Sequence, residues 1–186
     1  MSIEHPFYFL RHGETTWNAV GRTQGQIDAP LSDLGRRQAD MAAAALKGQP
    51  VSRIIASPLS RARHTAEAAG AALGLDIAFD DELMEFHAGD WQGEPRGERI
   101  HAYFAKETDP PGGEPFADFA ARAWRAIQRA AAAGPNALIV CHGGLWYAMS
   151  EYIRIDPPLW PMPNALPIRV TPREGVWTAE VIGAET

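Results

Sequence analysis

Short hydrophobic runs alternate along this chain with longer segments in which hydrophobic positions recur at helical spacing. Runs of about five residues that are rich in aromatic or branched side chains and bounded by turn residues are typical of buried strands. Near the end of the chain, two further runs flank Pro172–Gly175 and indicate a hairpin. The predicted strands are 6–10, 53–56, a weaker one at 76–83, 137–141, and the hairpin strands 167–171 and 176–182.

The longer segments predict four helices. Their expected ends come from capping residues, with Ser32 or Asp33 at the start of the first helix and Gly48 and Gly74 beyond the first two. The predicted helices are 32–48, 60–73, 115–133 and 145–153. The third has the clearest apolar face, made of Phe116, Phe119, Ala123, Ile127 and Ala130.

Strands that alternate with helices predict an α/β layer fold with a mainly parallel sheet. A length of 186 residues suits one domain over 1–186. Within it, the Pro- and Gly-rich segment at about 93–115 is expected to be a surface excursion with one short helical piece. The segment 156–167 has five prolines and is predicted to be a stiff connection.

Composition and net charge limit the molecules that the protein is expected to bind and the cross-links that it can form. The formal net charge is −6, which argues against non-specific binding to nucleic acid or to anionic membranes. Cys141 is the single cysteine, so neither an intrachain disulfide nor a multi-cysteine zinc site can form. The apolar run at 7–10 is too short for a signal segment or a membrane span, so a cytoplasmic protein is expected.

Two predicted strands end in the same way, with a histidine followed by glycine. The first runs into Arg11-His12-Gly13-Glu14 and the other into Cys141-His142-Gly143-Gly144. Ligands of parallel sheets bind beyond the carboxyl ends of the strands, and glycine lets a ligand approach the backbone closely. The helix expected after Gly143 has free N–H groups that suit an anion. The alternative is two structural histidines at strand ends.

A third strand ends in Ser57-Pro58-Leu59-Ser60-Arg61, at the start of a predicted helix. Cations in a first helical turn oppose the helix dipole at a cost of about 0.3–1 kcal/mol each, which a bound phosphate would reverse. We expect Arg61 to bind phosphate and Arg63 to reach into solvent.

The sequence motifs of other phosphate-binding proteins, hydrolases and metal sites are absent. The chain has no GxxxxGK[ST], GxSxG, HExxH or DxD pattern. Tyr147 stands where a cysteine-dependent phosphatase would need an arginine after Cys141, and Glu14 beside His12 has nothing nearby to complete a metal site. No metal and no cofactor are therefore expected.

Read together, the motifs resemble the histidine phosphatase superfamily, also called the phosphoglycerate-mutase-like family. The resemblance covers about 10 to 145, in the order of the family, and implies a three-layer α/β sandwich with helices on both faces of the sheet. The matching blocks are 11–18 (RHGETTWN), 21–25 (GRTQG), 28–31 (DAPL), 34–35 (LG), 57–62 (SPLSRA), 65–66 (TA), 83–85 (LME), 89–93 (GDWQG) and 141–144 (CHGG).

The resemblance implies a role for each site residue. His12 matches the nucleophile that becomes phosphohistidine, and Glu85 matches the proton donor. The implied phosphate pocket, with a protonated second histidine, consists of Arg11, Asn18, Arg61, His142 and Gly143. Gln24 and Gly25 are further candidates for substrate contacts. Two arginine forks and a cationic histidine would neutralise a phosphoryl group without a metal.

Departures from the family pattern indicate which branch of the family this sequence resembles more. The mutases are longer and carry a basic, tyrosine-containing segment after the acid. Here 86–91 (FHAGDW) looks more like the small phosphatases, including the α-ribazole phosphatase branch. Asn164-Ala165 is similar to the family's Asn-x-Ser motif, but Leu166 replaces the serine, which argues against a polar role there.

The predicted function is a metal-independent phosphomonoester hydrolase that acts on a small phosphorylated metabolite through phosphohistidine. Two alternatives stay open: mutase-type phosphoryl transfer, and a non-catalytic phosphate-binding regulator, against which the complete His/Arg/Glu set argues. A homodimer is not excluded. The aromatic side chains of Trp91, Tyr103 and Phe104 are expected to pack the excursion onto the sheet, in preference to forming a lid over the site. His87 is expected at the surface.

Overall fold

A computed structural model describes residues 3–159 and 161–183 of the chain. In this part, one sheet has the strand order β3-β2-β4-β1-β6-β7-β5. Its pairs β1–β4, β2–β4, β2–β3 and β5–β7 are parallel, whereas β6 runs antiparallel to β1 and β7. The strands are β1 (Phe7–Arg11), β2 (Arg53–Ala56), β3 (Ile77–Phe79), β4 (Ala137–Cys141), β5 (Ile155–Asp156), β6 (Ile168–Thr171) and β7 (Trp177–Val181).

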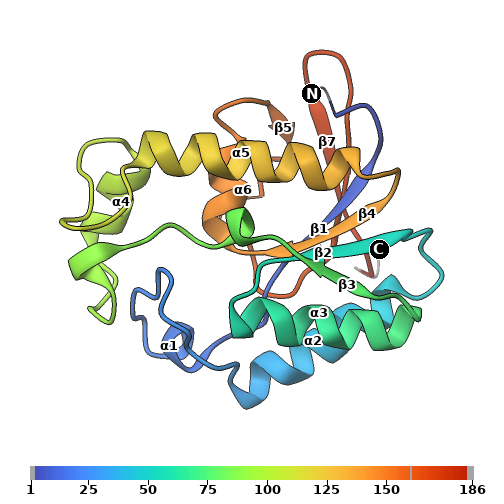
Figure 1. Cartoon of the computed structure of the whole chain (residues 1–186), viewed down its shortest axis with the longest axis horizontal. Helices are drawn as coiled ribbons and strands as arrows, with labels where there is room; N and C mark the ends of the chain where they lie inside the picture. The colour runs from blue at the N-terminus through green and yellow to red at the C-terminus, as the bar shows by residue number, and fades with distance from the viewer. Residues whose placement is uncertain (1–2, 160, 184–186) are drawn as a thin grey trace.

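Helices cover both faces of this sheet, so the predicted three-layer α/β sandwich is confirmed. In Figure 1, α5 and α6 lie above the sheet, α2 and α3 lie below it, and α1 and α4 lie at its left-hand end. The helices are α1 (Thr16–Ala19), α2 (Asp33–Leu46), α3 (Ser60–Leu73), α4 (Glu98–Phe104), α5 (Phe116–Ala132) and α6 (Gly143–Met149), with 3₁₀ turns η1 (Asp81–Leu83) and η2 (Gly89–Trp91).

The side chains of β1 point alternately to the two faces of the sheet and so contribute to both hydrophobic clusters. Phe7 and Phe9 belong to the cluster under α5 and α6, whereas Tyr8 and Leu10 belong to the cluster with α2 and α3. Successive side chains of a strand point to opposite faces, so one strand supplies both cores. The two strands that His12 and His142 directly follow, β1 and β4, are neighbours in the middle of the sheet.

Most predicted elements are present with ends shifted by one or two residues. The predicted strand at 76–83 is wrong over its second half, because Asp80 accepts from the backbone N–H of Glu82 and caps η1. The helix expected at 145–153 begins earlier, at Gly143, and ends at Met149. The short elements α1 and β5 have no periodicity that could have predicted them.

The excursion at 93–115 is anchored to the body of the protein by aromatic packing. Tyr103 of α4 is fully buried and stacks on Phe86 with ring centroids 4.5 Å apart. Its hydroxyl donates to the carbonyl of Glu114 (3.2 Å), and Trp91 is only 8% exposed. The expected packing is therefore confirmed for Tyr103 and Trp91, whereas Phe104 also lines a cavity, described below.

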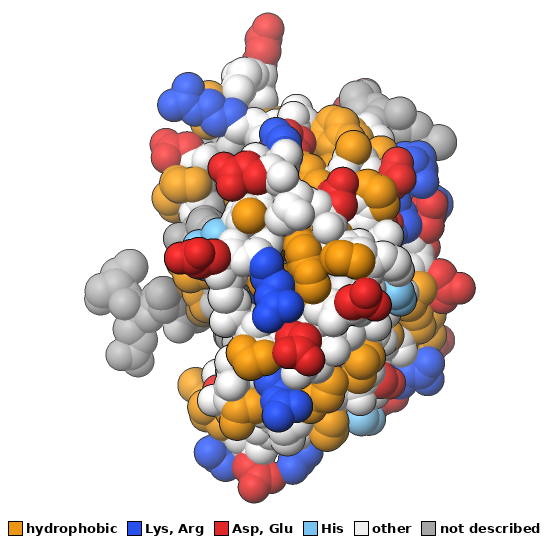
Figure 2. All heavy atoms as spheres, turned by 90° about the vertical axis from the view of Figure 1, so that its left-hand side faces the viewer, with side chains coloured by type: hydrophobic (Ala, Val, Ile, Leu, Met, Phe, Trp, Pro, Cys, Tyr) orange, Lys and Arg blue, Asp and Glu red, His pale blue; other side chains and the backbone are white. Residues whose placement is uncertain are grey.

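Figure 2 shows the face that lies at the left-hand side of Figure 1. Hydrophobic side chains lie there in small groups among acidic and basic ones. Within 3–159 and 161–183, no helix is long and apolar enough to cross a membrane.

The start of α2 lies unusually close to the loop that follows β1. A Cβ atom on Gly35 would lie 1.8 Å from the carbonyl oxygen of Glu14, and one on Gly13 would lie 2.3 Å from the carbonyl oxygen of Gly35. Both obstacles are backbone atoms, which cannot rotate away. Glycine at these two positions therefore lets α2 support the loop that carries His12.

We predict that Gly35→Ala destabilises the protein, although Gly→Ala inside a helix normally stabilises by roughly 0.5–1 kcal/mol. Overpacking against fixed atoms costs about 1–3 kcal/mol, so the sign should reverse. Urea unfolding measures the change. Met41→Ala, at a 71% exposed position of the same helix, should change the free energy of unfolding by less than about 0.5 kcal/mol. A more stable Gly35→Ala protein would contradict the close approach.

Candidate active site

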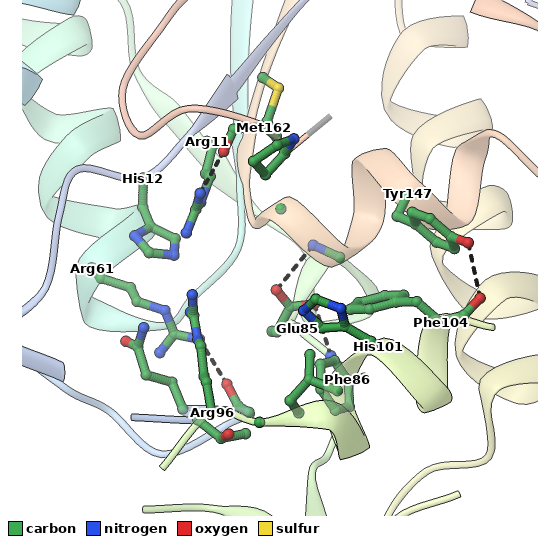
Figure 3. A pocket seen from close by; sticks show the side chains of 18 of the residues that line it. Arg11, His12, Arg61, Glu85, Phe86, Arg96, His101, Phe104, Tyr147 and Met162 are labelled. Carbon is green, nitrogen blue, oxygen red and sulfur yellow. Dashed lines mark hydrogen bonds between the residues drawn. The ribbon is translucent and has the colours of Figure 1, made fainter. Parts of the chain in front are cut away.

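A cavity of about 580 Å³ opens where β1 and β4 end, between α6 and the excursion (Figure 3). Of the predicted site residues, seven line it: Arg11, His12, Gln24, Gly25, Arg61, Glu85 and Gly143. Asn18 and His142 are not among the lining residues. His142 lies directly beside the cavity, however, because its ring centroid is 5.1 Å from that of His12.

His12 is held as a neutral imidazole with one defined tautomer. Its ring is 3% exposed, and Nδ1 lies 2.7 Å from the carbonyl oxygen of Gly13. A carbonyl only accepts hydrogen bonds, so Nδ1 carries the proton and Nε2 has a free electron pair. Burial, followed by the charges of Arg61 and Arg11, lowers the pKa of His12 well below its ordinary value.

Three separate elements fix the backbone of this loop. The N–H of His12 donates to the carbonyl of Cys141 in β4 (3.0 Å), and the N–H of Gly13 donates to Thr65 Oγ1 in α3 (3.1 Å). From the proline-rich connection, Asn164 Nδ2 donates to the carbonyl of His12 (2.9 Å). The argument from sequence against a polar role for Asn164 is therefore wrong.

Arg61 is almost completely buried and is oriented by carbonyl groups. It is 1% exposed, and its Nη1 and Nη2 atoms donate to the carbonyls of Ile27 (2.9 Å) and Gly25 (2.7 Å). Burial lowers its pKa to about 10, so it stays charged at neutral pH. Arg63, as expected, is exposed, and its guanidinium lies 4.4 Å above the ring of Phe79.

Arg11 is fixed in the same manner by the connection that leads to β6. Its Nη1 donates to the carbonyl of Met162, and its own carbonyl accepts from the N–H of Ala165 (3.0 Å). Burial lowers the pKa of Arg11 to about 10, and the positive charges of Arg96 and Arg61 act in the same direction. The half-buried Arg11 and the buried Arg61 thus lie beside His12 without a carboxylate partner at hydrogen-bond distance among the described residues.

Unsatisfied polar atoms concentrate around His12. Within the described chain, eight buried side-chain nitrogen or oxygen atoms have no hydrogen-bond partner, and six of them belong to residues of this region. They are Arg11 Nε, Asn18 Nδ2, Thr23 Oγ1, Gln24 Oε1, Arg61 Nε and His142 Nδ1. A buried polar atom left unpaired costs about 1–3 kcal/mol. The two arginine Nε–H groups and the amide of Asn18 are donors, so a bound oxyanion would satisfy them.

The amide of Asn18 is oriented by the cap of α1. Thr15 Oγ1 accepts from the N–H of Asn18 (3.0 Å), while Asn18 Oδ1 accepts from the N–H of Thr15 (3.2 Å). Because the cap occupies the amide oxygen, the NH₂ end stays available as a donor.

His142 is fully buried, and its Nε2 lies 2.8 Å from Ser57 Oγ at the end of β2. Burial, with the charges of Arg61, His12 and Arg11, lowers the pKa of His142 well below its ordinary value. Burial of the ring, followed by the nearby cations, thus favours a neutral His142 in the protein by itself, whereas the family resemblance implies a protonated ring. A phosphate dianion would shift this pKa upward.

Glu85 faces the cavity from the segment after η1, and backbone N–H groups hold its carboxyl group. Its Oε2 accepts from Gly144 at the start of α6 (3.1 Å), and Oε1 accepts from Phe86 (3.2 Å). Burial raises its pKa, while these hydrogen bonds and Arg61 oppose the shift. The N–H of Gly144 thus binds the acid instead of an external anion. A Cβ atom there would lie 2.1 Å from Glu85 Oε1.

A half-buried arginine of α5, Arg122, positions the segment that ends in Glu85. Arg122 Nη1 donates to the carbonyls of Glu82 (2.7 Å) and Met84 (2.8 Å), and Nη2 donates to that of Glu85 (3.3 Å). The carboxylate of Glu114 pairs with the same guanidinium at 2.8 and 2.7 Å. Sequence reasoning missed this residue, because an arginine in an amphipathic helix is normally solvated.

Arg96 is a second residue that the sequence did not reveal. It precedes α4 in the excursion, lines the cavity, and extends toward Arg61 in Figure 3. Burial lowers its pKa, and its charge in turn lowers the pKa of Arg11 and of His12. The excursion therefore supplies a third guanidinium to the side of the cavity where His12, Arg11 and Arg61 lie.

The remaining titratable residues of interest have local roles. Glu14 Oε1 accepts from Ser32 Oγ (2.7 Å), and His87 Nδ1 accepts from the N–H of Gly89 (3.3 Å). His87 does not line the cavity. The described residues contain no group of three or more His, Cys, Asp or Glu side chains that could hold a metal ion.

Known proteins are similar to this chain in sequence and in architecture. Residues 7–184 match the sequence model of the histidine phosphatase superfamily (branch 1). Glucosyl-3-phosphoglycerate phosphatase of Mycobacterium tuberculosis is 37% identical over 172 residues, which cover 82% of this chain and 77% of that protein. Phosphoglycerate mutase-like protein 4 of Arabidopsis thaliana is 37% identical over 159 residues, covering 78% and 69%.

Solved structures agree with the sequence relatives. A mycobacterial glucosyl-3-phosphoglycerate phosphatase in complex with VO3 superposes with a TM-score of 0.82 at 32% identity, covering 97% of this chain and all of that one. A putative α-ribazole-5′-phosphate phosphatase from Escherichia coli superposes with a TM-score of 0.78 at 26% identity, covering 96% of both chains. With the family match across both histidine motifs, these likenesses show that the chain belongs to the histidine phosphatase superfamily.

Proposed function

We propose that this protein is a phosphomonoester hydrolase that needs no metal and acts through a phosphohistidine on His12. The observation that supports this function is the neutral His12 imidazole, whose Nε2 electron pair is free beside the unpaired donors of Arg11 and Arg61. Relatives named as phosphatases support the same reaction class. The size of the cavity suits a small phosphorylated metabolite.

In the first step, Nε2 of His12 attacks phosphorus, and the bond from phosphorus to the ester oxygen breaks. The leaving oxygen takes its proton from Glu85, whose raised pKa favours the protonated form. The guanidinium groups of Arg11 and Arg61 neutralise charge on the equatorial oxygens. The hydrogen bond from Nδ1 to the carbonyl of Gly13 stabilises the cationic ring that forms.

In the second step, water attacks the phosphohistidine and the N–P bond breaks. Glu85, now a carboxylate, takes a proton from the water and is thereby restored to its acid form. The products are inorganic phosphate and neutral His12. A mutase would instead return the phosphoryl group to an organic acceptor, so release of inorganic phosphate distinguishes the two reactions.

We predict that His12→Ala lowers the release of inorganic phosphate by at least about 10⁴-fold, because the nucleophile is lost. His64→Ala, at an exposed position of α3, is the control and should retain activity. Quenching wild-type turnover without acid should trap a phosphoenzyme whose label maps to His12. A label on His142, or an active His12→Ala protein, would overturn the assignment.

We predict that the effect of Glu85→Gln depends on the leaving group. An alkyl phosphate needs the proton, so its phosphorylation rate should fall by roughly 10²–10⁴-fold. p-Nitrophenyl phosphate expels a stable phenolate and should lose much less. Burst kinetics separates phosphorylation from hydrolysis of the intermediate. Equal losses for both substrates would show that Glu85 tunes the charge of the site instead of donating a proton.

The same assignment predicts a pH dependence. Because the first step uses protonated Glu85, the phosphorylation rate with an alkyl phosphate should fall as the pH rises through the elevated pKa of this residue. Glutamine has no proton to lose, so the Glu85→Gln protein should lack this alkaline limb. A limb that survives in the variant belongs to another group.

We also predict that prolonged treatment with EDTA leaves phosphatase activity unchanged and that vanadate inhibits competitively. The positive charge that phosphoryl transfer requires comes from arginine side chains in this mechanism. The assay compares turnover before and after chelation, with Mg²⁺, Mn²⁺ and Zn²⁺ added back separately. Loss of activity that one of these ions restores would exclude the proposed mechanism.

A further inference from the structure

The two sides of the cavity differ in chemistry, and Glu85 lies between them. Figure 3 shows His12 and the three arginines on one side of Glu85 and aromatic side chains on the other. The larger apolar side chains on this second side are Phe86, Phe104 and Tyr147, together with Ile100, which lies one helical turn before Phe104 in α4. We name this second set the apolar wall.

The direction of the reaction fixes which part of a substrate meets each side. Displacement at phosphorus places the leaving oxygen opposite the attacking nitrogen. With His12 as nucleophile, that oxygen lies toward Glu85, which is the proposed proton donor. The rest of the leaving alcohol must therefore extend beyond Glu85 and away from His12. This direction leads to the apolar wall.

The apolar wall is held in place before any substrate binds. The rings of Phe104 in α4 and Tyr147 in α6 lie 4.7 Å apart, and the Tyr147 hydroxyl donates to the carbonyl of Phe104 (2.9 Å). Phe104 also packs edge-on against Phe86, with centroids 5.9 Å apart. Close by, the Lys106 ammonium pairs with Glu151 (2.5 Å) and so links the end of α4 to the segment after α6.

We infer that the substrate is a phosphomonoester whose alcohol carries a flat, apolar ring. This inference rests on the proposed function and extends it to the class of leaving group. A ring placed against Phe104 and Tyr147 would gain the hydrophobic and aromatic contacts that these side chains offer. A sugar in the same place would lose the hydrogen bonds of its hydroxyl groups to water and would meet Ile100 and the rings of Phe104 and Tyr147. His101 is the polar side chain that Figure 3 shows there.

The test compares substrates that differ only in the group that reaches the apolar wall. Propyl phosphate and 3-phenylpropyl phosphate have leaving alcohols of similar acidity, so Glu85 serves both equally. Burying the phenyl ring should raise kcat/KM by roughly 10- to 100-fold. Glucose 6-phosphate, an alkyl phosphate with a polar body, should be hydrolysed no faster than propyl phosphate.

A variant of the apolar wall connects this preference to the cavity. Ile100→Ser should reduce the ratio of kcat/KM for phenylpropyl over propyl phosphate, because the phenyl ring is the group that extends to the apolar wall and therefore to Ile100. Val20→Ser is the control, since Val20 is 67% exposed and does not line the cavity. It should leave the ratio unchanged.

Binding of phosphonates separates this inference from the proposed function. 3-Phenylpropylphosphonate should bind more tightly than propylphosphonate by a similar factor in calorimetry, whether or not the protein turns over phosphate esters. Equal affinities, or a preference for glucose 6-phosphate over phenylpropyl phosphate, would overturn the apolar-ring inference alone. Tighter binding of the phenyl compound without any turnover would overturn the proposed function and leave the apolar-ring inference standing.

Discussion

The site depends on one electrostatic constraint: Arg61 is buried and Arg11 half-buried beside His12, and no carboxylate of the described residues is paired to either. Burial of an unpaired cation is unfavourable, as the lowered pKa values of both guanidinium groups indicate. Backbone carbonyls of Gly25, Ile27 and Met162 offset part of this cost. Each Nε–H stays unsatisfied, and a bound phosphate group would supply the missing acceptor.

The same concentration of charge affects the protonation state of His12, the proposed nucleophile. The positive potential from Arg61 and Arg11 adds to burial and keeps His12 neutral, which a nucleophile requires. A neutral ring needs one of its nitrogens protonated, and the carbonyl of Gly13 selects Nδ1. In the proposed mechanism, phosphate binding and the nucleophilicity of His12 are therefore two consequences of one arrangement. The loop can hold it because β4, α3 and the proline-rich connection each contribute a hydrogen bond.

Glu85 needs an environment that balances two opposing demands. Burial favours the protonated acid that the proposed first step uses, while the N–H groups of Gly144 and Phe86 stabilise the carboxylate that the proposed second step uses. Arg122 maintains this position by holding the carbonyls that precede the acid, and its pairing with Glu114 connects the same loop to the excursion. The excursion thus supports the acid as well as adding Arg96 and Phe104 to the cavity.

The sequence by itself determined the layered α/β architecture, because hydrophobic periodicity and capping residues act over a few neighbouring positions. It also indicated His12, His142 and Arg61, since each follows or flanks the end of a predicted strand, where short-range rules and parallel topology suffice. Only the tertiary structure decided how Arg96, Arg122 and Asn164 contribute. Their contacts join segments far apart in the chain, as with Asn164 and His12, so no local pattern predicts them. The charge of His142 was likewise decided by the fold, because it depends on how many cations are buried together around one imidazole.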